Sequence, residues 1–423
     1  MTQPANTWRA LCLLAMVAAW PAFGQADPPA VRGGPERGGN GLKVGNGRLH
    51  LTFDFETRFD SAAGYFPRPG SGDPVVVSDQ LSGEALLHIR PGVRLELPGS
   101  KLDLSLKGYA DYIHYTGLIT PGSTNTSRVE AMADLNLTYD REAPIGFELQ
   151  DHLQRSDQTS SAAIGAGVLS LYNEVQLKVP IRPGGGAFEV TPLLAWGIEH
   201  FKATGALPPV GCDSAECDPD LVSTFDYSNV RMGLNARWRF LPKTAVVVDT
   251  DFNVHTYARG RTPTALLMHA RAGLSGLVTP KIAVTATMGW GKDFGEVAGS
   301  ALLAQLEANY LLSQTASLKV GYTRTLEPVA YLGLFRDDRG YVEAQALLGG
   351  RLSLRAISSL DFLKFQGDRR DTLYKLELGP QYQFERWLVL GAGYLLGVRS
   401  SSMGGAGINY SRHEGYVRVS VMY

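Results

Sequence analysis

Apolar and polar residues alternate along most of the chain from about residue 47 onward. The pattern is clearest in the last stretch, His413 to Tyr423 (HEGYVRVSVMY), where every second residue from Val417 is apolar. A period of two predicts a β-strand with one apolar face and one polar face. The chain ends on an aromatic residue in the apolar phase, Tyr423, so the last residue is expected on the apolar face.

The same alternation recurs in eighteen segments, which we expect to be strands. Their ranges are 49–60, 87–97, 102–111, 128–140, 145–156, 166–179, 187–201, 225–240, 244–257, 264–278, 281–293, 301–312, 315–327, 340–349, 351–365, 371–385, 386–398 and 409–423. Tight turns alternate with longer polar loops between them, including a loop at 328–339. An even strand number with this alternation predicts an all-β fold, an antiparallel up-and-down transmembrane β-barrel with both termini periplasmic.

Aromatic residues at the expected strand ends agree with a barrel that crosses a membrane. Two tryptophans are expected near loop ends, and six aromatic residues near turn ends. These are Trp196 and Trp290, and then Tyr139, Trp238, Phe240, Tyr310, Phe384 and Tyr423. Amphipathic rings prefer the membrane–water interface, so the two sets predict two interfacial girdles.

The amino-terminal segment has the features of a secretory signal peptide. Arg9 precedes an apolar run from Ala10 to Trp20, and small residues stand before Gln25, so cleavage is expected near Gly24. The run is too short to span a bilayer. We therefore expect a signal peptide at 1–24, a flexible Pro- and Gly-rich periplasmic linker at 25–46 and the barrel at 47–423.

Composition narrows the functional classes. The formal net charge of −1 gives no reason to expect a nucleic-acid partner. The mean hydropathy is −0.07, and no run of eighteen apolar residues follows the signal segment. The chain has no G-x-S-x-G or H-E-x-x-H motif, and its eight histidines are scattered. The sequence therefore predicts no enzyme, no metal site and no cofactor.

Eighteen strands enclose a lumen wide enough for water, and many inward positions carry charge. The predicted acidic wall is Asp103, Asp111, Glu130, Asp134, Glu148, Glu174, Glu189 and Glu199. The predicted basic wall is Arg231, Arg237, Arg239, Arg271, Arg351 and Arg355. Opposed walls would create a transverse field that orients charged solutes. In the alternative interpretation, the charges pair across strands and only hydrate the pore.

Four tyrosines share the inward phase: Tyr109, Tyr172, Tyr341 and Tyr416. Aromatic faces in a wet channel can stack on sugar rings, whose hydroxyl groups need polar partners. Inward amides supply such partners: Asn136, Gln150, Gln176, Asn235 and Gln305. This mixture is typical of a carbohydrate conduit, although isolated tyrosines line many barrels.

Cys212 and Cys217 lie in the expected loop 202–224 and are predicted to form a disulfide, because the chain is exported. The bond would restrain a small acidic ring (GCDSAECD). A solvated loop is the favoured interpretation of that ring over a calcium site.

The segment 321–348 (GYTRTLEPVAYLGLFRDDRGYVEAQALL) resembles barrel porins encoded beside exopolysaccharide and spore-coat polysaccharide export genes. The similarity lies in Gly321-Tyr322, in a loop with Pro328, and in Asp338-Arg339-Gly340-Tyr341. It implies an outer-membrane channel that exports a polysaccharide with a separate periplasmic polysaccharide-export protein. A general or solute-specific diffusion porin is the alternative, and an adhesive barrel with a plugged lumen is a third.

An aromatic carboxyl terminus behind a signal peptide also predicts how such a chain reaches its place. We expect the barrel-assembly machinery of a Gram-negative bacterium to read Tyr423 as an assembly signal. The outer membrane is the expected location, and its lipid the expected partner of the apolar face.

Overall fold

The architecture is seen in a computed structural model. The structure describes residues 41–61, 83–119, 127–141, 143–156, 168–203, 226–258, 263–296, 298–329, 333–402 and 410–423. The predicted signal peptide and the Cys212–Cys217 pair lie outside the described residues. Within them, no helix is long and apolar enough to cross a membrane.

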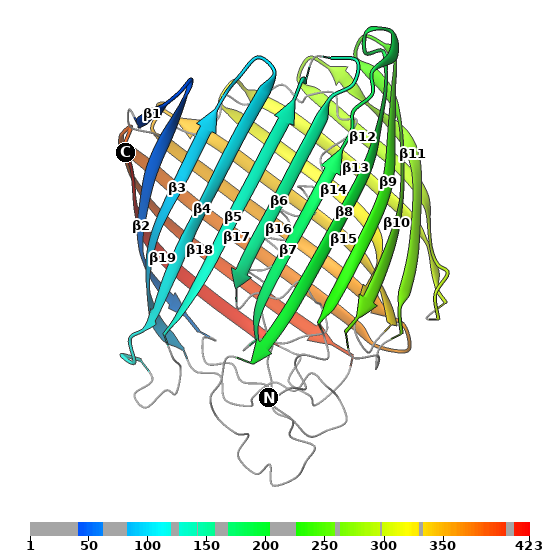
Figure 1. Cartoon of the computed structure of the whole chain (residues 1–423). Coiled ribbons are helices and arrows are strands. Elements are labelled where there is room, and N and C mark those ends of the chain that lie inside the picture. Colours follow the sequence, from blue (N-terminus) through cyan, green and yellow to red (C-terminus); the bar gives the residue numbers. More distant parts are fainter. Residues whose placement is uncertain are drawn as a thin grey trace.

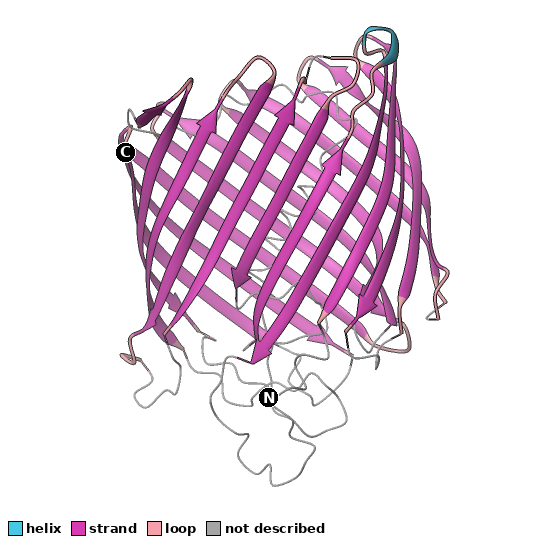
Figure 2. Ribbon diagram, in the orientation of Figure 1, coloured by secondary structure: helices cyan, strands magenta, loops and turns pink. Residues whose placement is uncertain are grey.

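Strands account for nearly all of the described chain (Figure 2). Their bounds are β1 (Leu42–Val44), β2 (Gly47–Asp60), β3 (Glu84–Leu97), β4 (Leu102–Tyr115), β5 (Arg128–Tyr139), β6 (Phe147–Ser156), β7 (Val168–Lys178), β8 (Phe188–Ala203), β9 (Tyr227–Leu241), β10 (Thr244–Tyr257), β11 (Ala265–Thr279), β12 (Ile282–Asp293), β13 (Ser300–Ser313), β14 (Ala316–Val329), β15 (Gly333–Leu348), β16 (Leu352–Phe365), β17 (Arg370–Glu385), β18 (Leu388–Ser401) and β19 (Tyr410–Met422). A short 3₁₀ turn, η1 (Pro183–Gly185), joins β7 to β8.

The strands close into a tilted barrel (Figure 1). Each strand from β2 to β19 pairs antiparallel with the next, and β19 pairs with β2, so eighteen strands form the ring. The predicted strand number is confirmed. The short turns after β3, β9 and β17 lie at one end, where the carboxyl terminus also lies (Figure 1).

The barrel is apolar outside and polar inside, the reverse of a soluble protein. On β2, Phe53 and Phe55 are exposed, whereas Glu56, the residue after Phe55, is fully buried. An apolar surface of this extent is stable in lipid and not in water. The predicted girdle residues are all exposed, although Trp196 stands near the middle of β8 and not near its loop end. A polar pair lies on the outer face of β6 and β7, where Asn173 Nδ2 donates to Asp151 Oδ1 over 2.7 Å.

Two predicted boundaries are wrong. Residues 42–44, expected in the flexible linker, form β1 and pair with the beginning of β2. The described residues of the expected loop at 328–339 are strand, because the ladder between β14 and β15 continues to Val329 and Gly333. A run of charge and glycine at 337–340 mimics a turn, but these residues pair in register inside the hairpin.

Candidate functional site in the barrel lumen

A network of buried charges lines the lumen where the barrel closes. Glu56 on β2 accepts hydrogen bonds from Arg58 Nε at 2.8 Å and from Arg418 Nε, on β19, at 2.6 Å. One strand further, Arg90 Nη2 donates to Asp111 Oδ2 over 2.6 Å. His88 Nδ1 lies 3.0 Å from the same oxygen. The pairing neutralises most of this charge locally, because each carboxylate faces cations from neighbouring strands.

Similar groups continue around the loop end of the barrel. Asp371 accepts from Arg369 Nη2 at 2.9 Å and from Arg399 Nε at 3.1 Å. Asp361 accepts from Arg339 Nε at 2.6 Å, and Lys375 Nζ lies 3.2 Å from its other oxygen. These sets tie β15, β16, β17 and β18 together from the inside.

The predicted acidic residues are interleaved with cations. The salt-bridge partners are Arg90 for Asp111, Arg128 for Glu130, Lys107 for Asp134, Arg231 for Glu174 and Arg182 for Glu189. Of the remaining three, Asp103 is exposed, Glu148 stands opposite Lys178 in the ladder, and Glu199 is buried. The described carboxylates therefore do not form a surface of one sign.

The predicted basic residues are divided in the same way. Arg271 donates to Asp249 over 2.6 Å, and Arg355 lies 3.1 Å from Glu343. Arg237 stands opposite Glu189 in the ladder, and Arg239 is exposed. Arg351 lies in the turn before β16 and not in the strand.

The four predicted tyrosines lie apart and are engaged with polar neighbours. The guanidinium carbons of Arg58 and Arg418 lie 5.5 and 5.1 Å from the centroid of the Tyr416 ring. Tyr172 donates to Glu174 over 2.9 Å, and Tyr341 donates to Glu307 over 2.5 Å. Arg90 lies 5.3 Å from the Tyr109 ring. The structure does not bring the four rings together as one stacking track.

Glycines on neighbouring strands leave the space that two of these rings occupy. A Cβ on Gly393 would overlap the Tyr416 ring, and one on Gly321 would overlap the Tyr341 ring. Each ring therefore lies close against the backbone of the adjacent strand.

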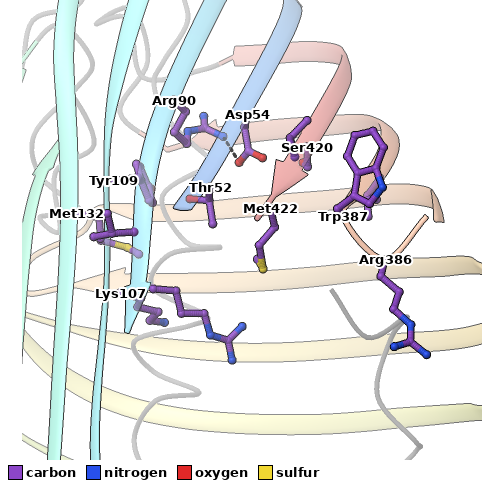
Figure 3. A pocket seen from close by; sticks show the side chains of 15 residues that line it. Thr52, Asp54, Arg90, Lys107, Tyr109, Met132, Arg386, Trp387, Ser420 and Met422 are labelled. Atoms are coloured by element: carbon purple, nitrogen blue, oxygen red, sulfur yellow. Dashed lines mark ion pairs between the residues drawn. The ribbon is translucent and has the colours of Figure 1, made fainter. Parts of the chain in front are cut away.

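A hollow of about 280 Å³ lies near the short-turn end (Figure 3). Arg90, Lys107 and Arg386 line it together with Asp54, whose carboxylate lies 3.8 Å from Arg90 Nη1. Tyr109 and Trp387 contribute aromatic surface. The charged residues that line the hollow are mostly basic, and Val93, Met132, Val389, Val421 and Met422 add apolar surface.

The end of the β14–β15 hairpin folds into the barrel. The ladder between β13 and β14 stops at Ala304 and Arg324, whereas β14 stays paired with β15 to its end. Leu326 and Leu334 then pack with Ala265, Leu267, Leu303 and partly buried Ala301. Leu267 and Leu303 occupy inward positions of β11 and β13, so the hairpin end lies against the inner face of the barrel.

A second apolar cluster covers the other side of the hairpin end. Val329 packs with Leu363 and Phe365 of β16, and Phe335 and Leu373 flank them. The lumen is thus narrowed from one side by a packed hairpin.

Sequence reasoning missed two parts of this site. The charges at the closing seam, Glu56, Arg58 and Arg418, stand in the inward phase but depend on pairing between the two ends of the chain. The hairpin was missed because Leu326 and Leu334 occupy the phase that elsewhere faces lipid.

No family model and no curated protein sequence matches the chain. Among solved structures, the siderophore receptor PirA from Pseudomonas aeruginosa is similar at 10% identity and a TM-score of 0.46, over 92% of this chain and 85% of that one. OccAB3 from Acinetobacter baumannii is similar at 8% identity and a TM-score of 0.46, over 90% of this chain and 100% of that one. OccAB4 from the same organism gives 9% identity and 0.45, over 89% and 98%. At this level the similarity says nothing about what passes through the barrel.

The class of the protein follows from its own geometry. A closed ring of eighteen antiparallel strands presents apolar side chains outward and charged side chains inward. Short turns gather at one end with the carboxyl terminus. This is a transmembrane β-barrel of the type found in Gram-negative outer membranes.

Proposed function

We propose that the protein is a passive diffusion porin for small polar and charged solutes. The observation that carries the proposal is the lumen itself, which is lined by charged and polar groups and narrowed on one side by the β14–β15 hairpin. Water and hydrated solutes need such a lining, because an apolar pore of the same size would expel water.

The charge pairing supports low selectivity between cations and anions. Carboxylates and guanidinium groups alternate around the lumen, so neither sign dominates the described surface. The solutes are expected to be excluded by size and polarity more than by charge.

Export of a polysaccharide with a periplasmic export protein is the competing hypothesis. Its support was the resemblance at 321–348, and the loop in that resemblance is paired strand in the structure. None of the comparisons supports the export hypothesis. The diffusion porin is therefore the function that we favour.

We also propose that the short turns face the periplasm and that residues 1–24 are removed on secretion. The carboxyl terminus lies among the short turns, and transmembrane β-barrels have short periplasmic turns and longer extracellular loops.

Purified protein in a planar lipid bilayer tests the proposal. We expect stepwise ionic conductance with weak preference between potassium and chloride, and entry of small sugars that reduces the ion current. A barrel that inserts, as shown by heat-modifiable electrophoretic migration, but never conducts would contradict the porin and favour the plugged adhesive barrel.

A further inference from the structure

One buried histidine of the barrel wall contacts the inward hairpin. His269 of β11 is buried, and its Nε2 lies 3.0 Å from the backbone oxygen of Leu326 on β14. Its Nδ1 lies 3.2 Å from Oδ2 of Asp251 on β10. The ring therefore connects the wall of the barrel to the folded hairpin through both nitrogens.

The two partners of His269 determine its protonation. A backbone carbonyl oxygen accepts hydrogen bonds and never donates, and an ionised carboxylate does the same. A neutral imidazole has one donor, so it satisfies only one of the two. Both bonds form together only when the His269–Asp251 pair holds one proton more than neutral histidine with ionised aspartate.

Without that proton, the neutral ring carries its hydrogen on either Nδ1 or Nε2. The tautomer with hydrogen on Nδ1 releases the hairpin. If the ring keeps its proton on Nδ1, the bond to Asp251 survives and a lone pair faces the Leu326 oxygen. The opposite tautomer sets a lone pair against a carboxylate. The bond to the charged group is the stronger of the two, so the contact with Leu326 is the one that breaks.

Other charged groups act on this pair from the same strand and from the hairpin. Glu327 of β14 and Arg271 of β11 interact electrostatically with His269. Arg271 is itself bonded to Asp249, and Arg231 of β9 acts on Glu327. Glu327 lies next to Leu326, so its charge moves with the hairpin.

We propose that His269 is a positioning residue that latches the β14–β15 hairpin inside the lumen at low pH and releases it as the pH rises. The inference rests on the proposed porin function. The inward state binds one more proton than the released state, so protons favour the narrow channel. For one proton, the ratio of latched to released channels changes by at most about tenfold per pH unit.

Single-channel conductance of the full protein, measured from about pH 5 to about pH 8, tests the latch because histidine ordinarily titrates in that range. We expect conductance to rise with pH through one transition. His269→Phe keeps a ring of similar shape without donors, and should give high conductance at every pH.

Asp251→Asn should have the opposite effect. The asparagine amide can donate to Nδ1 while a neutral ring donates from Nε2 to Leu326, so both bonds form without the extra proton. We expect low conductance at every pH. The matched control is His255→Phe, which removes another buried inward histidine, one that stacks on Tyr227 at 4.1 Å. It should leave the transition in place.

Several results would overturn the latch. These are a wild-type conductance that does not change with pH, a transition that persists in folded His269→Phe, or high conductance of Asp251→Asn at low pH. If His269→Phe does not fold, wild type and Asp251→Asn still decide the question. Absence of channels at any pH would instead contradict the porin function.

Discussion

At the scale of single residues, Glu56 shows how a charge is accommodated inside this barrel. Its side chain is fully buried and receives hydrogen bonds from two arginines on different strands. A carboxylate in such a place is stable only while its partners remain, because an uncompensated buried charge is costly. Glu56 therefore joins β2 to β19 at the point where the barrel closes.

We predict that Glu56→Gln destabilises the folded barrel by about 3 kcal/mol, the lower end of the range for breaking a buried ion pair. The reason is that Arg58 and Arg418 would face each other without their shared anion. The temperature at which the heat-modifiable band unfolds measures the loss.

Asp54→Asn is the matched control, since Asp54 is on the same strand but lies 3.8 Å from its partner Arg90 and is more exposed. It should lower the unfolding temperature less. Equal effects of the two substitutions would show that the closing network has no special part in stability.

How much of this charged network the sequence predicts depends on how far apart in the sequence the paired residues lie. The period of two correctly assigns Glu56 and Arg418 to the inner face, because alternation is a local property. It does not tell which inward charges meet. Register between β2 and β19 brings together residues separated by 362 positions, and that register is set by the closure of the whole ring.

At the scale of elements, the last strand completes the barrel through backbone bonds. The Tyr423 nitrogen donates to the Leu51 oxygen over 2.9 Å, and the side chain is 59% exposed on the outer face. Beyond this point β1 pairs with the first residues of β2, so the edge of β2 stays hydrogen-bonded past the end of β19. The Tyr423 side chain adds nothing to these bonds, and its role as an assembly signal stays a prediction.

We therefore expect Tyr423→Lys to reduce the amount of folded protein in the membrane, while Tyr423→Phe retains it. Both variants keep the backbone nitrogen, so they differ only in what the assembly machinery and the lipid interface meet. The measurement is the heat-modifiable fraction in isolated membranes. Wild-type amounts of folded Tyr423→Lys would exclude the proposed signal.

The β14–β15 hairpin marks the limit of prediction from a pattern. Residues 326 and 334 alternate as lipid-facing residues do, and nothing local distinguishes them from the leucines of other strands. Their position is decided by packing against Leu267 and Leu303, which are far away in the sequence. The strands were predictable from local alternation, whereas the inward fold depends on contacts with the inner faces of β11, β13 and β16.

At the scale of the whole molecule, one ring of strands has an apolar outer surface and a polar inner surface. The outer surface needs lipid, and the inner surface needs water. In the porin that we propose, their separation across a single layer of backbone makes the barrel a route between two aqueous compartments. The hairpin and the paired charges then determine how wide and how polar that route is.

The central claim, diffusion of small solutes, is tested most directly in cells that lack the gene. Influx of a small polar solute and the amount of surface polysaccharide are measured in the same strain, with and without the gene restored. The account predicts slower influx, recovered on complementation, with unchanged polysaccharide. Normal influx together with loss of surface polysaccharide would contradict it and establish an export channel instead.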